Sequence, residues 1–125
     1  MNARTLPELV REAAERFGAR AAIVDPENER SLTFSGLAAA VEEAARAWMA
    51  LGVERGDRVA LWAPNSWAWE VAALGAQSAG AVLVPLNTRW KAREAAYVLE
   101  RSRARALVTV VGFLDVDYVA RLRES

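Results

Sequence analysis

Residues 56–84 read GDRVALWAPNSWAWEVAALGAQSAGAVLV, and this stretch decides the fold. Two short apolar runs, Arg58 to Ala63 and Ala81 to Val84, surround a segment from Ser66 to Ala79 that has the length of a helix. Gly80 follows this segment as a typical helix cap. A strand, a helix and a strand with short connections predict a right-handed crossover onto a parallel sheet.

The same alternation continues along the chain. Lys91 to Ser102 predicts a further helix, and Ala106 to Val111 predicts a third strand. Nearly continuous apolar strands are typical of a parallel sheet covered on both faces. The predicted fold class is therefore α/β, in three layers, with a parallel core sheet flanked by helices. Val116 to Arg123 predicts a last amphipathic helix, which stops at Ser125 without a glycine cap, so we expect a partial domain.

A helix and a small hairpin are predicted before the sheet. Leu6 to Phe17 carries apolar residues at helical spacing, with Thr5 and Glu8 as a capping box. Gly18 is expected to end this helix in the left-handed conformation. The turn sequence DPEN at residues 25–28 lies between two β-prone runs and predicts the hairpin.

A second N-terminal helix is predicted after the hairpin. Thr33 is the expected N-cap, and apolar residues at helical spacing continue to Leu51. Gly52 follows at the position where a helix commonly ends.

The composition excludes several classes of function. Apolar residues make up 54% of the chain and charged residues 26%, which is enough to form and solvate a core. Sixteen basic and sixteen acidic residues give a net charge of zero, so nucleic acid is not an expected partner. Cysteine and histidine are absent, which excludes disulfides, thiolate nucleophiles and Cys/His zinc sites.

Membrane insertion and export are also not expected. The stretch from Val71 to Thr88 is uncharged, but Gly75 and Gly80 interrupt it and Pro85 follows, so it predicts a helix and a strand instead of a transmembrane segment. Charged residues stand near the N-terminus where a signal peptide needs an apolar run. The expected location is cytoplasmic.

Ligands of open α/β sheets bind beyond the carboxyl ends of the strands, which directs attention to three loops. The first covers residues 64–67, the second residues 85–90, and the third centres on Gly112 and Phe113.

Two of these loops contain candidate binding residues. Asn65 and Ser66 either receive an anion at a helix N-terminus or only cap that helix, which is the commoner role. Arg89, beside Trp90 and Lys91, either holds a phosphate while the indole stacks on a base, or lies at a solvated helix start.

Other patterns point away from nucleotide and metal sites. Arg101, Arg103 and Arg105 alternate as in a nucleic-acid contact, but cations near a helix C-terminus more simply oppose the helix dipole. The glycines fit neither G-x-G-x-x-G nor a P-loop, and no cluster of Asp and Glu suggests a metal site.

The run GVERGDRVA at residues 52–60 resembles the N-terminal segment of AMP-forming acyl-CoA synthetases, a family of adenylate-forming ligases. The similarity continues, in the same order and spacing, through short pieces elsewhere in the chain: Leu32, Thr33, Phe34, Leu37, Pro64, Asn65, Ser66, Gly80, Ala81, Val82, Pro85, Leu86, Asn87, Glu94, Tyr97 and Ser102. The resemblance therefore extends over nearly the whole chain.

The resemblance implies an ATP-dependent ligase that joins a carboxylic acid to CoA and releases AMP and pyrophosphate. The complete enzyme would use ATP, Mg and CoA, and residues 1–125 would be the N-terminal part of its large N-terminal domain. The family's catalytic and metal-binding motifs lie outside this segment. Arg89 matches a position near the nucleotide end of CoA in some aryl-CoA ligases, so it is the one candidate cofactor-binding residue.

We expect the chain alone neither to adenylate a carboxylate nor to bind ATP tightly. Two alternatives to a ligase segment remain open at this point. One is a small, non-catalytic flavodoxin-like binding module, and the other is a remnant that binds a partner through the surface that the rest of the ligase would cover.

Overall fold

A three-stranded parallel sheet lies at the centre of the structure, a computed structural model that describes residues 1–113 and 116–124. Its strands, in spatial order, are β4 (Val82–Pro85), β3 (Arg58–Trp62) and β5 (Ala106–Thr109). Leu61 of the central strand lies opposite Pro85 on one side and Val108 on the other. The prediction of an α/β fold with a parallel core sheet is confirmed.

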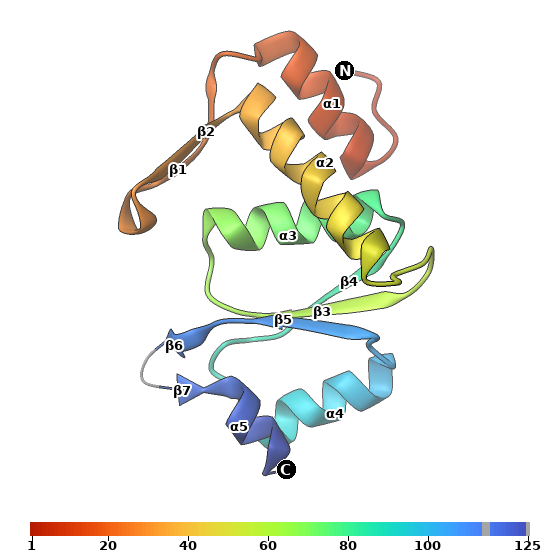
Figure 1. Cartoon of the computed structure of the whole chain (residues 1–125), viewed down its shortest axis with the longest axis vertical. Helices are drawn as coiled ribbons and strands as arrows, with labels where there is room; N and C mark the ends of the chain where they lie inside the picture. The colour runs from red at the N-terminus through yellow and green to blue at the C-terminus, as the bar shows by residue number, and fades with distance from the viewer. Residues whose placement is uncertain (114–115, 125) are drawn as a thin grey trace.

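Helices cover both faces of this sheet (Figure 1). On one side are α1 (Leu6–Phe17), α2 (Phe34–Ala50) and α3 (Trp67–Ser78), and on the other are α4 (Ala92–Ser102) and α5 (Tyr118–Arg123). The central strand supplies side chains to both layers, since Val59 packs with Trp48 of α2, whereas Ala60 and Trp62 pack with Ala95 of α4. This double coverage accounts for the continuous apolar pattern of the strands.

The predicted hairpin consists of β1 (Ala21–Asp25) and β2 (Arg30–Thr33), joined by the short 3-10 helix η1 (Pro26–Asn28). Figure 1 shows the hairpin projecting from the body beside α2 and α3. Leu32 is buried with Leu37 of α2 and anchors the base of the hairpin.

Glycines at the ends of the first three long helices have two different roles. Gly52 and Gly80 follow α2 and α3, which confirms the predicted helix ends, and their φ values of 89° and 88° are left-handed. The prediction for Gly18 is wrong, because its φ is −20°. A Cβ on Gly18 would lie 2.8 Å from Ser35 Oγ and 3.0 Å from the carbonyl oxygen of Ala14, so there is little space for a side chain where α1 ends beside the start of α2.

Close packing also explains a glycine inside α3. A Cβ on Gly75 would lie 2.5 Å from the Cβ of Ala44, where α2 crosses α3. Nearby, the indole Nε1 of Trp48 donates a hydrogen bond of 3.1 Å to the carbonyl of Ala72. Small residues at the crossing therefore let a buried indole reach the backbone of the neighbouring helix.

The C-terminal part differs from the prediction. The third parallel strand ends at Thr109, and β6 (Val111–Phe113) pairs antiparallel with β7 (Val116–Asp117). The last helix begins at Tyr118 instead of Val116, because the side chain of Asp117 caps it by accepting a hydrogen bond of 2.9 Å from the backbone N–H of Ala120.

Within the described ranges, no helix combines the length and the apolar character needed to cross a bilayer. The uncharged stretch 71–88 divides into the end of α3, the Gly80 cap and β4, as its sequence predicts.

Candidate functional site

The loops after β3 and β4 meet at the carboxyl edge of the parallel sheet, where they enclose an open hollow of about 410 Å³. Its lining residues come from the ends of both strands and the start of α3: Ala63, Pro64, Asn65, Trp69, Pro85, Leu86, Asn87 and Thr88. The structure thus brings together two of the three loops predicted from the sequence. This is the edge at which open α/β sheets bind ligands.

Hydrogen bonds to Asn87 hold the loop after β4 in place. The buried indole of Trp62 donates from Nε1 to the carbonyl of Asn87 over 2.9 Å. The side-chain oxygen of Asn87 accepts from the backbone N–H of Arg89 at 2.9 Å, and the carbonyl of Asn87 also accepts from the N–H of Trp90 at 3.1 Å. Asn87 therefore fixes the turn that presents Arg89.

Arg89 is exposed, as a binding residue for a large ligand must be. Its guanidinium makes no hydrogen bond or ion pair with any other residue in the described ranges. Trp90 is partly buried and packs against the buried cluster that contains Trp62 and Ala95. The structure leaves the arginine exposed, whereas the indole is partly buried against the core.

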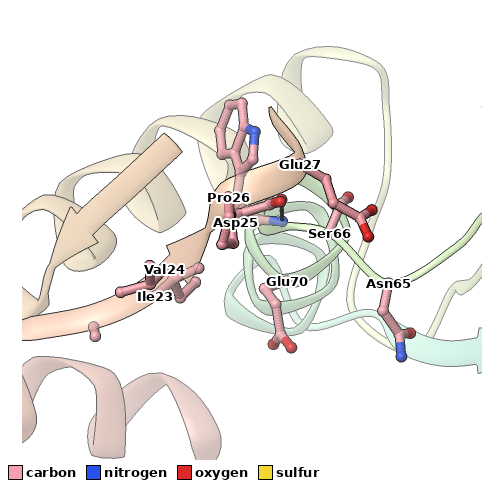
Figure 2. A pocket seen from close by; sticks show the side chains of 10 residues that line it. Ile23, Val24, Asp25, Pro26, Glu27, Asn65, Ser66 and Glu70 are labelled. Atoms are coloured by element: carbon pink, nitrogen blue, oxygen red, sulfur yellow. Dashed lines mark hydrogen bonds between the residues drawn. The ribbon is translucent and has the colours of Figure 1, made fainter. Parts of the chain in front are cut away.

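The N-terminus of α3 is capped by the protein itself. Ser66 Oγ accepts a hydrogen bond of 3.1 Å from the N–H of Trp69, which confirms the capping role predicted for this residue. A second donor, the N–H of Trp67, is bound by the carboxylate of Asp25 at 2.9 Å (Figure 2). The anion expected at a helix N-terminus is here a side chain of the hairpin.

Sequence reasoning missed this role of Asp25. The hydrogen bond from Trp67 is the main reason that the pKa of Asp25 is lowered, and the side-chain amide of Asn28 lowers it further. A carboxylate three positions before Asn28 does signal a local turn, which the structure contains. The contact with Trp67 spans 42 residues, so no local pattern indicates it.

The third predicted loop is not a loop. Gly112 and Phe113 belong to β6, which pairs with β7, so the prediction of a ligand loop centred on them is wrong. A run of apolar residues such as 106–113 does not show by itself where one strand ends and the next begins.

Two of the three alternating arginines have structural roles. Arg105 Nε lies 3.5 Å from Asp57 Oδ2, and Arg103 ends α4 with a φ of 53°. The carbonyls at this helix end are bound by Arg58, whose Nε donates to Ser102 over 2.7 Å. In the part of the chain that the structure describes, no group of three or more Asp or Glu residues is placed to hold a metal ion.

Comparison with known proteins gives a consistent family. A family model described as AMP-binding enzyme matches residues 10–125. The chain is 44% identical over 121 residues to 3-[(3aS,4S,7aS)-7a-methyl-1,5-dioxo-octahydro-1H-inden-4-yl]propanoyl:CoA ligase from Rhodococcus jostii, covering 97% of this chain and 23% of the relative. It is 33% identical over 124 residues to the human mitochondrial medium-chain acyl-CoA ligase ACSF2, covering 99% of this chain and 20% of the relative.

Solved structures agree with this assignment. An inhibitor-bound N-terminal domain of FACL13 from Mycobacterium tuberculosis superposes with a TM-score of 0.90 at 28% identity, covering 98% of this chain and 30% of that one. A fatty acyl CoA synthetase from the same organism gives a TM-score of 0.89 at 29% identity, covering 97% of this chain and 24% of the other.

The chain spans about a fifth to a quarter of the length of the ligases that it matches. The matches nevertheless cover nearly all of its own residues, and the observed parallel sheet superposes on the solved domains. The chain therefore belongs to the AMP-binding enzyme family, in which it corresponds to an N-terminal segment of the acyl-CoA ligases.

Proposed function

We propose that residues 1–125 form the N-terminal part of the large N-terminal domain of an ATP-dependent acid:CoA ligase. The observation that carries the proposal is the 44% identity to a CoA ligase over 97% of the chain. In the proposed reaction, the carboxylic acid attacks ATP to give an acyl-adenylate and pyrophosphate. The thiol of CoA then displaces AMP and leaves the acyl-CoA.

Of the three ligands that the complete enzyme would use, CoA, ATP and Mg²⁺, the residues of this segment fit only CoA. A phosphate of CoA suits Arg89, because a guanidinium binds phosphate in a bidentate manner and this one is exposed on a fixed turn. The triphosphate of ATP does not fit, since the described loops contain no glycine-rich backbone cradle. Mg²⁺ does not fit either, because the described acidic residues form no cluster.

The proposal therefore gives this segment two tasks. It supplies the first parallel strands of the domain, and it presents Arg89 to the nucleotide end of CoA. The triphosphate and the metal ion are assigned to the remainder of the ligase.

Two half-reactions test the proposal in the ligase that carries this segment. Exchange of labelled pyrophosphate into ATP reports formation of the adenylate, and loss of free thiol reports formation of the thioester. We expect both to depend on the same carboxylic acid. A protein that consumes no ATP with any of a panel of aliphatic, aryl and polycyclic acids would contradict the assignment.

A binding measurement on residues 1–125 tests whether ATP and the metal ion bind to the remainder of the ligase and not to this segment. We expect equilibrium dialysis with ATP and Mg²⁺ to show no micromolar binding at physiological salt, because one exposed Arg and one Lys attract a triphosphate only weakly in salt. Micromolar binding would instead favour a self-contained nucleotide-binding module.

A cytoplasmic location is part of the same proposal. The relative ACSF2 is named as mitochondrial, so the family itself does not fix the compartment. Fractionation of cells that express the tagged ligase distinguishes a cytoplasmic from an organellar protein.

A further inference from the structure

The indole of Trp62 belongs to the central strand β3, yet it binds the turn that carries Arg89. Trp62 is fully buried, and its Nε1 donates a hydrogen bond of 2.9 Å to the carbonyl of Asn87. Arg89 follows two residues further along the same turn and is exposed. A side chain of the core is therefore in direct contact with the backbone of the loop that carries the proposed CoA contact.

This bond extends the attachment of β4 to β3 beyond the end of the sheet. The backbone ladder between the two strands reaches Leu86, whose N–H donates to the carbonyl of Leu61 at 2.8 Å. The indole of Trp62 then binds the next residue of the chain, Asn87. Loops are usually more mobile than the strands that they follow. Here a core side chain holds the first residue after the ladder.

Apolar contacts hold the turn of residues 87–90 on both sides. Leu86, before the turn, is buried in the cluster that contains Trp62, and Trp90, at its end, packs against the same cluster. Within the turn, the side chain of Asn87 accepts the N–H of Arg89, and its carbonyl accepts the N–H of Trp90. This carbonyl is shared between the turn and the indole, so the shape of the turn and the position of Trp62 depend on each other.

We propose that Trp62 is a positioning residue for CoA, which holds the turn 87–90 so that Arg89 is presented in one place. A loop that is already ordered in its bound conformation loses less entropy when the ligand binds, so its affinity is higher. A buried N–H that loses its partner costs free energy, which keeps the indole bound to Asn87. This role rests on the proposed function, from which the contact between Arg89 and CoA is taken.

Trp62→Phe in the complete ligase removes the indole donor and keeps an aromatic ring in the core. We expect the KM for CoA to rise about fivefold, the usual effect of one neutral hydrogen bond. Exchange of pyrophosphate into ATP and the rate at saturating CoA should keep their wild-type values. Benzothienylalanine at the same position, which has the shape of the indole but no N–H, makes the same test without a change in packing. A wild-type KM for CoA in either variant would overturn the proposal.

Trp48→Phe is the matched control. Trp48 is also buried, and its Nε1 donates to the carbonyl of Ala72 at 3.1 Å, but it packs in the cluster on the other side of the sheet. We expect urea unfolding to show a similar loss of stability in Trp48→Phe and Trp62→Phe, and the KM for CoA to rise only in Trp62→Phe. An equal rise in both would mean that lost stability causes the effect, and the positioning role would be wrong.

Hydrogen exchange gives a readout that does not depend on catalysis. The amides of Arg89 and Trp90 both donate to Asn87, so they report directly on the turn. We expect them to exchange about fivefold faster in Trp62→Phe than in the wild type or in Trp48→Phe. Unchanged exchange at both amides would overturn the proposal.

The double variant of Trp62→Phe and Arg89→Ala separates the positioning role from the CoA contact itself. If the indole acts through Arg89, its loss adds nothing to the KM for CoA once the guanidinium is absent. An equal rise with and without Arg89 would overturn the proposal. If Arg89→Ala alone leaves the KM unchanged, the CoA contact is wrong and the positioning role fails with it. If only Trp62→Phe leaves the KM unchanged, the contact stands and the positioning role alone is wrong.

Discussion

The two edges of the parallel sheet differ in what their side chains do. At the amino edge, near the starts of β3 and β5, the side chains of Asp57, Arg58 and Arg105 bind protein backbone or each other. At the carboxyl edge, the loop after β4 leaves Arg89 exposed and without a described partner. The run GVERGDRVA, which is the most recognisable part of the sequence, lies at the amino edge. The most recognisable residues are therefore architectural, and ligand contacts are expected at the other edge.

The contacts of the amino edge are specific. Arg58 donates from Nε to the carbonyl of Ser102 and from a terminal nitrogen to the carbonyl of Gly56 at 3.0 Å. Asp57 accepts the N–H of Glu54 at 2.8 Å. The bond from Arg58 to Ser102 joins the start of β3 to the end of α4, and the other two fix the turn before β3.

The largest effect is expected from Gly80→Ala. Gly80 has a φ of 88°, and a Cβ there would lie 3.2 Å from the Cα of Arg55. The left-handed conformation costs about 1–2 kcal/mol for alanine, and crowding against backbone adds about as much, so we expect a loss near 3 kcal/mol. Urea unfolding of the ligase, followed at its first transition, measures it.

Gly56→Ala separates the cost of the left-handed conformation from the cost of crowding. Gly56 has a φ of 86°, but a Cβ there meets nothing within 4 Å. We therefore expect this variant to lose only the conformational part, about 1–2 kcal/mol. Equal losses of stability in Gly80→Ala and Gly56→Ala would show that Arg55 moves aside for the added Cβ at no cost in free energy.

The next effect is expected from Arg58→Met, which keeps an apolar stem and removes the guanidinium. The carbonyls of Ser102 and Gly56 lose a charged donor, and hydrogen bonds to charged groups contribute about 1.5–3 kcal/mol. We expect a loss of about 2.5 kcal/mol in stability and no change in the KM for CoA. Arg101→Met is the control, because Arg101 is exposed on the same helix end. A raised KM for CoA would contradict the architectural role of this edge.

The sequence predicted the elements that depend on local signals. Helix faces, the caps at Gly52 and Gly80 and the alternation of strand and helix are all encoded within about 15 residues, where periodicity and turn chemistry act. Contacts between distant residues were not predictable in this way. The indole of Trp62 reaches the carbonyl of Asn87, 25 residues away, and no spacing rule connects the two.

The errors have the same origin. Gly18 suited a left-handed cap, but its φ is −20° where the end of α1 lies close to Ser35 of α2. At the carboxyl edge, the sequence identified Arg89 and its loop, but not that Trp90 would pack against the core. In both cases the local sequence allowed two structures, and contacts with residues distant in the sequence determined which of them forms.

The variant Arg89→Ala tests whether the carboxyl edge of the sheet binds CoA. If the guanidinium binds a phosphate of CoA, its loss weakens thioester formation by on the order of 1–3 kcal/mol, while pyrophosphate exchange is unaffected. Separate assays of the two half-reactions measure this difference. Arg93→Ala is the control, since Arg93 is also exposed but lies within α4. Equal effects on both half-reactions, or none on either, would remove Arg89 from the site.

The smallest effect is expected from Asp25→Asn, which removes a charge and keeps the size of the side chain. The pKa of Asp25 is lowered from 3.8, first by the N–H of Trp67, so the ionised form is favoured in the folded protein. A lowered folded pKa gives a stabilisation that is fully present above the unfolded pKa. It is lost as the pH falls through the folded pKa.

The pH dependence distinguishes this charge from a merely steric contact. We expect the urea midpoint of the wild type to exceed that of Asp25→Asn by a small, constant amount above about pH 5. The difference should shrink below the ordinary pKa of 3.8, because the wild-type carboxyl then becomes protonated and resembles the amide in charge. Glu15→Gln, at an exposed position of α1, controls for the loss of any carboxylate. A difference that persists unchanged at low pH would mean that the shape of Asp25, and not its charge, attaches the hairpin to α3.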